Sequence, residues 1–156
     1  MKLTADEVKD RMRHLEECLR ERGIKVTHQR LEIFREVAQS GGHPDVERIY
    51  RGVRKRVPTV SLDTVYRTLL LLLDLGLLTT LGPPRDRARF DANMKTHHHF
   101  VCSKCGVTQD FYHEAFNQLK IPDRVQEWGR MERTQVEIKG TCEKCLRNIG
   151  KGSEKK

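Results

Sequence analysis

The sequence contains no hydrophobic run long enough to cross a membrane. Its longest apolar run is "LLLLL" at residues 69–73, which Asp74 ends, whereas a membrane-spanning helix needs about 20 apolar residues. The first residues, "MKLTADEVKDR", also lack the apolar core of a signal peptide. Because 37% of the residues are apolar and 33% are charged, we expect a soluble, globular and cytoplasmic protein.

The motifs of metal-dependent hydrolases and deaminases are also missing. The sequence has no HExxH motif, and no HxE motif leads into a CxxC pair. Such enzymes need a general-base glutamate beside an open metal position. We therefore expect that the protein is not an enzyme.

Acidic residues are in the minority. The chain has 30 Lys and Arg against 22 Asp and Glu, a net charge of +8. This surplus suggests a polyanionic partner such as nucleic acid, although many basic proteins bind none.

The N-terminal half has the apolar spacing of helices. Thr4 and Glu7 form a capping box, and similar start signals stand at Thr27, Asp45 and Ser61. Together with helix-ending Gly and Pro residues, they predict helices at about residues 4–23, 27–40, 45–57 and 61–76.

Two extended stretches follow these helices. "LLTTL" at 77–81 and "ARFDA" at 88–92 flank "GPPRDR", which predicts a β-hairpin. A helix bundle closed by a hairpin indicates a winged helix-turn-helix, in which residues 62–75 would enter the DNA major groove. The candidate DNA contacts on the helix and the wing are Thr64, Tyr66, Arg67, Arg85, Arg87 and Arg89. These residues alone also fit a solvated helix face with ordinary arginines.

Four of the five cysteines form two CxxC pairs, 102–105 and 142–145. Two cysteines three residues apart present both sulfurs to one ion, and four thiolates suit tetrahedral Zn²⁺. The alternative is four unliganded thiols or a redox pair. Cys18 stands alone beside Leu15 and Leu19 and fits a small core residue.

A run of histidines precedes the first CxxC pair. If residues 97–102 form a strand, His97 and His99 point to one face, about 6.5 Å apart between Cα atoms, and His98 points to the other. Two imidazoles with carboxylates suit Fe²⁺ or Mn²⁺. Other candidate ligands are Asp91, Asp110 and His43. The sequence therefore accommodates two metals of different chemistry.

Several of these motifs, in this order, resemble the ferric uptake regulator family of bacterial metal-dependent repressors. The resemblance runs from about residue 23 to residue 146. It rests on "KVTHQRLEIF" (25–34), "GGHPDVERIY" (41–50), "VSLDTVYRTL" (60–69), "RFD" (89–91), "HHHFVCSKCG" (97–106), "DF" (110–111) and "GTCEKC" (140–145).

The resemblance implies an α+β protein with an N-terminal winged helix-turn-helix and a small C-terminal α/β dimerisation domain. We place these domains at residues 1–90 and 91–150, followed by a disordered tail at 151–156. It implies a structural zinc site of Cys102, Cys105, Cys142 and Cys145. It also implies a regulatory site for Fe²⁺ or Mn²⁺ formed by His43, Asp91, His97, His99 and Asp110.

The family includes peroxide-sensing and iron-responsive repressors, and the sequence favours the first. Asp110 resembles the peroxide-sensing branch, as do Thr96 and Thr134, which stand where many iron-uptake regulators have extra metal-binding histidines. Arg67, in contrast, resembles the iron-uptake branch. In peroxide sensors, Fe²⁺ reacts with peroxide and a histidine ligand is oxidised, which here would be His43 or His97.

We expect a homodimer that binds a pseudo-palindromic DNA operator in its metal-bound shape and weakly without metal. An iron-responsive repressor of metal homeostasis genes is the alternative. A structural zinc protein without DNA binding is a more distant one, because it leaves the predicted wing and the nitrogen and oxygen ligands without a purpose.

Overall fold

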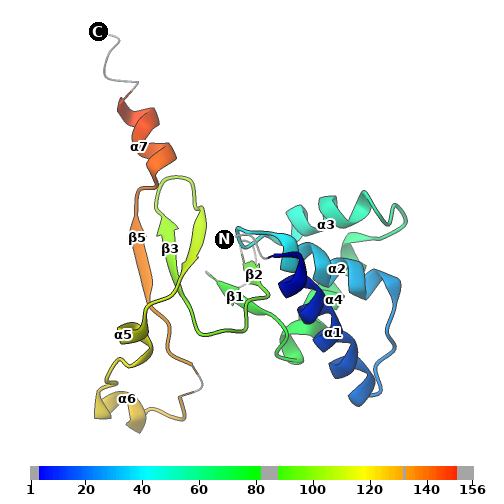
Figure 1. Cartoon of the computed structure of the whole chain (residues 1–156), viewed down its shortest axis with the longest axis horizontal. Helices are drawn as coiled ribbons and strands as arrows, with labels where there is room; N and C mark the ends of the chain where they lie inside the picture. Colours follow the sequence, from blue (N-terminus) through cyan, green and yellow to red (C-terminus); the bar gives the residue numbers. More distant parts are fainter. Residues whose placement is uncertain (1–3, 82–87, 132, 151–156) are drawn as a thin grey trace. The chain divides into compact units, whose positions relative to one another are not determined.

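A computed structural model of the chain describes residues 4–81, 88–131 and 133–150 (Figure 1). The chain forms two compact units, Met1–Met94 and Lys95–Lys156. The division follows residue 94, whereas the sequence placed it after residue 90, so Asp91 belongs to the first unit. The predicted disordered tail at 151–156 lies outside the described residues. None of the helices in the described ranges has the length and hydrophobicity that crossing a membrane requires.

The described part of the first unit contains the predicted helices. They are α1 (Ala5–Glu21), α2 (His28–Gln39), α3 (Val46–Arg54) and α4 (Leu62–Asp74). Each begins directly after the predicted cap, whose side chain accepts a hydrogen bond from the backbone N–H three residues further on. These bonds satisfy amide groups that have no partner within the helix. The predicted helix starts at Thr4, Thr27, Asp45 and Ser61 are therefore confirmed.

The predicted hairpin is also confirmed. β1 (Thr79–Leu81) pairs antiparallel with β2 (Arg89–Asp91), with Thr79 opposite Asp91. Together with α3 and α4 it forms the predicted winged helix-turn-helix. Arg85 and Arg87, the predicted wing contacts, lie outside the described residues.

The helices of the first unit share one apolar core with the hairpin. Leu15, Ile33, Ile49 and Leu69 are fully buried in it, each from a different helix. Cys18 packs against the same core, as the sequence predicted. The core thus holds α4 by its inner face and leaves the other face to solvent.

A buried carboxylate joins α2 to the segment before α4. Glu32 is 3% exposed and forms ion pairs with Arg35 and Arg56. Arg56 also binds Glu36 at 2.8 Å. A buried charge is tolerated only when it is paired, so these contacts fix the turn that leads into α4.

The second unit is built on a sheet with the strand order β4-β3-β5 in its described part. The strands are β3 (His98–Cys102), β4 (Thr108–Phe111) and β5 (Glu137–Gly140). β4 is antiparallel to β3, and β5 is parallel to it. The short helices α5 (Glu114–Asn117) and α6 (Asp123–Glu127) connect β4 to β5, and α7 (Glu143–Gly150) continues from β5 at the opposite end of the sheet (Figure 1). The α+β class is confirmed.

Two adjacent leucines of α4 provide a test of this packing. Leu69 is 0% exposed and Leu70 is 45% exposed. We expect Leu69→Ala to lower the free energy of unfolding by about 2–5 kcal/mol, since it leaves a cavity in the core. Leu70→Ala should change it by less than about 0.5 kcal/mol. Urea unfolding followed by circular dichroism measures both, and equal losses would contradict the placement of α4.

Candidate metal centres

The four cysteines of the CxxC pairs lie together in the second unit. One ligand atom from each lies within 4.8 Å of the others. Cys102 ends β3 and Cys105 follows in the turn, while Cys142 and Cys145 lie where β5 leads into α7. Cys102 pairs with Gly140 in the β3–β5 ladder, so strand pairing brings the two CxxC pairs to the same end of the sheet.

The environments of these thiols favour a divalent cation. The backbone N–H groups of Cys105 and Cys142 lower the pKa of Cys102 to about 6, the latter lying 3.3 Å from its sulfur. Hydrogen bonds with the side chains of Cys142 and Cys105 raise the pKa of Cys145 to about 12. The cluster thus does not hold four negative charges by itself. A soft cation that accepts four sulfur ligands, such as Zn²⁺, fits it.

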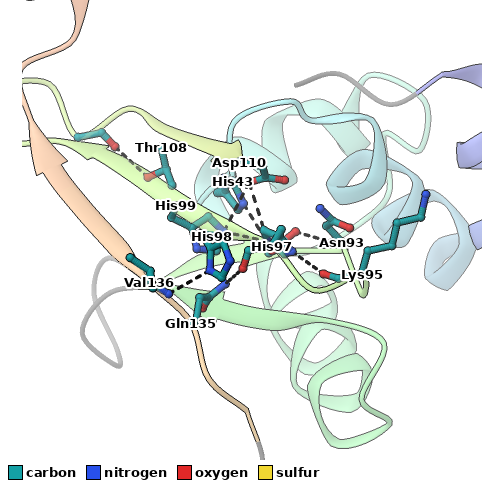
Figure 2. A network of polar contacts seen from close by, with 12 residues as sticks. His43, Asn93, Lys95, His97, His98, His99, Thr108, Asp110, Gln135 and Val136 are labelled. Carbon is teal, nitrogen blue, oxygen red and sulfur yellow. Dashed lines mark hydrogen bonds and ion pairs between the residues drawn. The ribbon is translucent and has the colours of Figure 1, made fainter. Parts of the chain in front are cut away.

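The second unit also brings two histidines and an aspartate together (Figure 2). Nε2 of His97 and Nε2 of His99 are 3.0 Å apart. Asp110, opposite His99 in the β3–β4 ladder, places Oδ1 3.5 Å from Nε2 of His99 and 4.0 Å from Nε2 of His97. Nδ1 of His97 lies 2.6 Å from the carbonyl oxygen of Lys95. Such a bond places the proton on Nδ1, so Nε2 carries the lone pair on the side of His99 and Asp110.

His98 points to the opposite side of β3, as the sequence predicted. Its Nε2 donates to Oδ1 of Asn117 at 3.1 Å, and its Nδ1 accepts from the N–H of Val136 at 3.2 Å. The ring also packs between Phe111 and Phe116. Both nitrogens thus serve the fold of the second unit.

The first unit holds the remaining two predicted ligands as a pair. Nε2 of His43 lies 3.5 Å from Oδ2 of Asp91, and both side chains are buried. The other oxygen of Asp91 accepts from the backbone N–H of Asn93 at 2.7 Å. An Asp bound to the N–H two residues further on forms a tight turn. That turn holds the carboxylate with Oδ2 toward the imidazole.

The backbone of His43 is in the left-handed region, with φ 47°, which no other non-glycine residue of the described chain shares. This conformation costs about 1–3 kcal/mol and persists only where neighbours enforce it. Here Arg89 donates to the carbonyl oxygen of His43 at 3.4 Å, and Phe90 N–H donates to that of Pro44 at 3.0 Å. β2 therefore holds both the loop of His43 and the carboxylate of Asp91.

On α4, the predicted DNA contacts differ in exposure. Tyr66 is 46% exposed, and the side chain of Arg67 is 79% exposed, with Nε 2.9 Å from a carboxylate oxygen of Asp63. Thr64 is half-buried, and its hydroxyl lies 2.9 Å from that of Ser61 in the helix cap. Tyr66 and Arg67 thus project from the fold, whereas the hydroxyl of Thr64 contributes to the cap.

The sequence did not identify the residues that hold the ligands in place, although it named Arg89 as a candidate DNA contact. They are Asn93, Lys95 and Arg89, which contact Asp91, His97 and His43. The Asp-x-Asn spacing of Asp91 and Asn93 is typical of a turn and was a signal for the first of them. Lys95 acts through its backbone carbonyl oxygen, and Arg89 contacts His43, which is distant in the sequence. Neither kind of contact leaves a pattern in a sequence.

Removal of one clustered thiol tests the cysteine site. We expect Cys102→Ser to lose bound zinc and to lower the thermal midpoint of the second unit, because a structural zinc ion stabilises the fold that binds it. Zinc content measured by mass spectrometry and thermal unfolding report both effects. Cys18→Ser is the matched control and should keep its zinc. Full zinc content in Cys102→Ser would contradict a four-cysteine site.

Known proteins are similar to this chain in sequence and in fold. A family model described as "Ferric uptake regulator family" matches residues 21–139. The peroxide-responsive repressor PerR of Staphylococcus epidermidis is 30% identical over 128 residues, which are 81% of this chain and 85% of that protein. A solved zinc-bound manganese uptake regulator is 33% identical, with a TM-score of 0.63, over 82% of this chain and 98% of its own. The Helicobacter pylori ferric uptake regulator shares the fold, with a TM-score of 0.70 at 21% identity over 94% of this chain and 97% of its own.

The matched family segment includes both CxxC cysteines of the first pair, the histidine run and all of the winged helix from α2 onward. The resemblance noted in the sequence is thereby confirmed. The chain belongs to the ferric uptake regulator family, whose members are metal-responsive regulators.

Proposed function

We propose that the protein is a metal-dependent, DNA-binding transcriptional repressor that acts as a cytoplasmic homodimer and senses peroxide. The observation that carries this proposal is the set of His97, His99 and Asp110, which presents nitrogen and oxygen atoms within 4.0 Å of one another. This set is chemically distinct from the four thiols in the same unit. A protein that binds only one structural metal would not need this second set of ligands.

The regulatory site combines this set with the pair in the first unit. His43 and Asp91 offer two ligands and the second unit offers three, so neither set alone provides five. His97 follows Asp91 by six positions, and a chain of that length spans at most roughly 20 Å, so the chain allows both sets to bind one ion. Three imidazoles and two carboxylates suit Fe²⁺ or Mn²⁺.

A metal held by ligands from both units would fix the angle between them. In a homodimer that angle sets the separation of the two α4 helices, and half-sites on DNA have a fixed spacing. Metal occupancy would thus select the DNA-binding shape, and by thermodynamic reciprocity DNA would raise the affinity for metal. Zn²⁺ held by Cys102, Cys105, Cys142 and Cys145 has another role. The four thiols lie at the β3–β4 turn and at the start of α7, so Zn²⁺ bound by all four would link these segments and leave no coordination position for a reactant.

For DNA contact, α4 offers Tyr66 and Arg67 on its exposed face. An arginine at this position can pair with guanine or phosphate, and a tyrosine can contact a thymine methyl group or phosphate. The net charge of +8 supports a polyanionic partner.

A second copy of the chain is the partner that best fits the exposed surface of the second unit. β5 lies at one edge of the sheet, and Glu137, Ile138 and Lys139 are all exposed there. Trp128, 74% exposed, and Leu119, 45% exposed, add large apolar side chains. Edges of sheets pair readily with other strands, so a homodimer through this unit would cover both features.

Peroxide sensing is the favoured branch because Asp110 and the peroxide-responsive relatives point to it. Bound Fe²⁺ would supply the one-electron chemistry that splits peroxide. The chain supplies the oxidised group, His43 or His97. In the net change one oxygen atom of H₂O₂ is added to an imidazole carbon and the other leaves as water. Iron-responsive repression is the alternative, and Arg67 is the residue that favours it.

A gel shift on DNA selected from a random duplex library tests repression. With Mn²⁺ we expect a shift that the metal-free protein lacks, because only the metal-bound shape fits two half-sites. Asp110→Asn should abolish the effect of Mn²⁺, since it removes a ligand charge. Arg67→Ala should weaken DNA binding about 5- to 160-fold and leave Mn²⁺ binding unchanged, because one good base contact contributes about 1–3 kcal/mol.

The matched control for Arg67→Ala is Arg13→Ala, whose side chain pairs with Asp10 on α1. It should bind DNA like the original chain. If no DNA sequence shows a metal-dependent shift, the protein is instead a structural zinc protein without DNA binding.

Mass spectrometry after Fe²⁺ loading and peroxide treatment separates the two branches. A peroxide sensor should gain one oxygen atom on His43 or His97 and lose DNA binding in parallel. His98 is the internal control, because both of its ring nitrogens serve hydrogen bonds of the fold. Unmodified histidines with DNA binding retained would instead establish iron-responsive repression.

A further inference from the structure

Helix α1 is connected to Asp91 through the side chain of Asn93. Nη2 of Arg11, on α1, donates to Oδ1 of Asn93 at 3.2 Å. Asn93 is 4% exposed, and its backbone N–H donates to Oδ1 of Asp91 at 2.7 Å. We propose that Arg11 is a positioning residue for the regulatory metal, which orients Asp91 through Asn93 and links metal occupancy to the order of α1. This inference rests on the proposed role of Asp91 as a ligand.

The argument starts from the two oxygens of the Asp91 carboxylate. Oδ1 is held by the turn at residues 91–93, and Oδ2 faces Nε2 of His43 at 3.5 Å. The direction of Oδ2 therefore depends on where the turn lies. β2 ends at Asp91, so strand pairing fixes only the first residue of that turn.

Asn93 is the part of the turn that the helix holds. Loss of a donor to a buried amide oxygen is unfavourable, so removal of the Arg11 guanidinium favours a shift of Asn93. Because the N–H of Asn93 and Oδ1 of Asp91 share a hydrogen bond, such a shift also turns the carboxylate. Arg11 therefore acts on the ligand through Asn93.

The coupling must also operate in the reverse direction. If α1 favours the orientation of Asp91 that binds metal, then bound metal favours the ordered position of α1. α1 is held to the core by Met12, Leu15 and Leu19, and Arg11 directly precedes the first of these. Metal binding should thus stabilise the part of α1 around Arg11.

The test measures Mn²⁺ affinity of the full chain by competition with a fluorescent chelator. We expect Arg11→Ala and Asn93→Ala each to weaken binding about tenfold, as is typical of residues that orient a metal ligand. Asn93→Ala keeps the backbone N–H that donates to Asp91 and removes the side-chain oxygen that accepts from Arg11. The double variant should therefore bind Mn²⁺ no more weakly than Asn93→Ala alone. Arg11→Lys, which retains a donor, should recover part of the affinity.

Arg13→Ala is the matched control, because Arg13 lies on the same helix and pairs with Asp10 in solvent. It should bind Mn²⁺ like the original chain. Zinc content and the thermal midpoint show whether each variant is folded. If Arg11→Ala is not folded, the test relies on Asn93→Ala.

Amide hydrogen exchange provides a second readout that does not depend on DNA binding. Mn²⁺ should slow exchange in α1 of the original chain and should fail to do so in Arg11→Ala. Equal Mn²⁺ affinity of Arg11→Ala and the original chain would overturn the inference, as would additive losses in the double variant. Asp91→Asn separates this failure from that of the proposed site. If it binds Mn²⁺ normally, Asp91 is not a ligand, and the five-ligand site fails together with this inference. If Asp91→Asn loses Mn²⁺ binding while Arg11→Ala binds it normally, only the role of Arg11 is overturned.

Discussion

The register of β3 with its two neighbours is the constraint on which both ligand clusters of the second unit depend. The antiparallel pairing with β4 sets His99 opposite Asp110. The parallel pairing with β5 sets Cys102 opposite Gly140, close to Cys142. Side chains alternate along a strand. A shift of one residue in the pairing of β3 with β4 would therefore turn His99 away from Asp110 and put His98 in its position. One strand thus fixes a nitrogen and oxygen cluster at its start and a sulfur cluster at its end.

The same alternation keeps the adjacent histidines apart. His97 and His99 meet on one side with Nε2 atoms 3.0 Å apart, and His98 on the other side binds Asn117 and Val136. Through these bonds, His98 holds α5 and the residue before β5 against β3. These hydrogen bonds hold the ring of His98 on its own side of β3, away from the other two imidazoles. The three histidines therefore combine a proposed metal-binding role, for His97 and His99, with a structural role for His98.

How much of this could be predicted from the sequence depends on how local the cause is. The caps at Thr4, Thr27, Asp45 and Ser61 act within three residues, and each was predicted. The CxxC spacing and the alternation of the histidines are equally local, and the structure gathers the cysteines and separates His98 as expected. In contrast, the contact between Arg11 and Asn93 joins residues 82 positions apart.

Backbone strain and buried charge were also missed, for a physical reason. The left-handed conformation of His43 is imposed by Arg89 and by the bond from Phe90 to Pro44, not by the sequence "GGHPD" itself. Glu32 has the polarity of a surface residue, and only its pairing with Arg56 from another element explains its burial. Periodicity cannot reveal contacts that depend on the final packing.

The strain at His43 bears on how the proposed regulatory metal would act. A residue held in a costly conformation before metal arrives does not have to be ordered by the metal, and the same is true of Asp91, which the turn at Asn93 already orients. When ligands are ordered before the metal binds, less of the binding free energy is spent on ordering them. More of it is then available to drive a conformational change elsewhere in the protein. In this protein the change would be the restriction of one unit relative to the other. A ligand shifts a conformational equilibrium only by the difference in its affinity for the two states. If the two halves of the proposed site are each ordered in advance, the difference in affinity arises when the metal joins them. Under the proposed function, this is the step that a DNA-binding dimer would use.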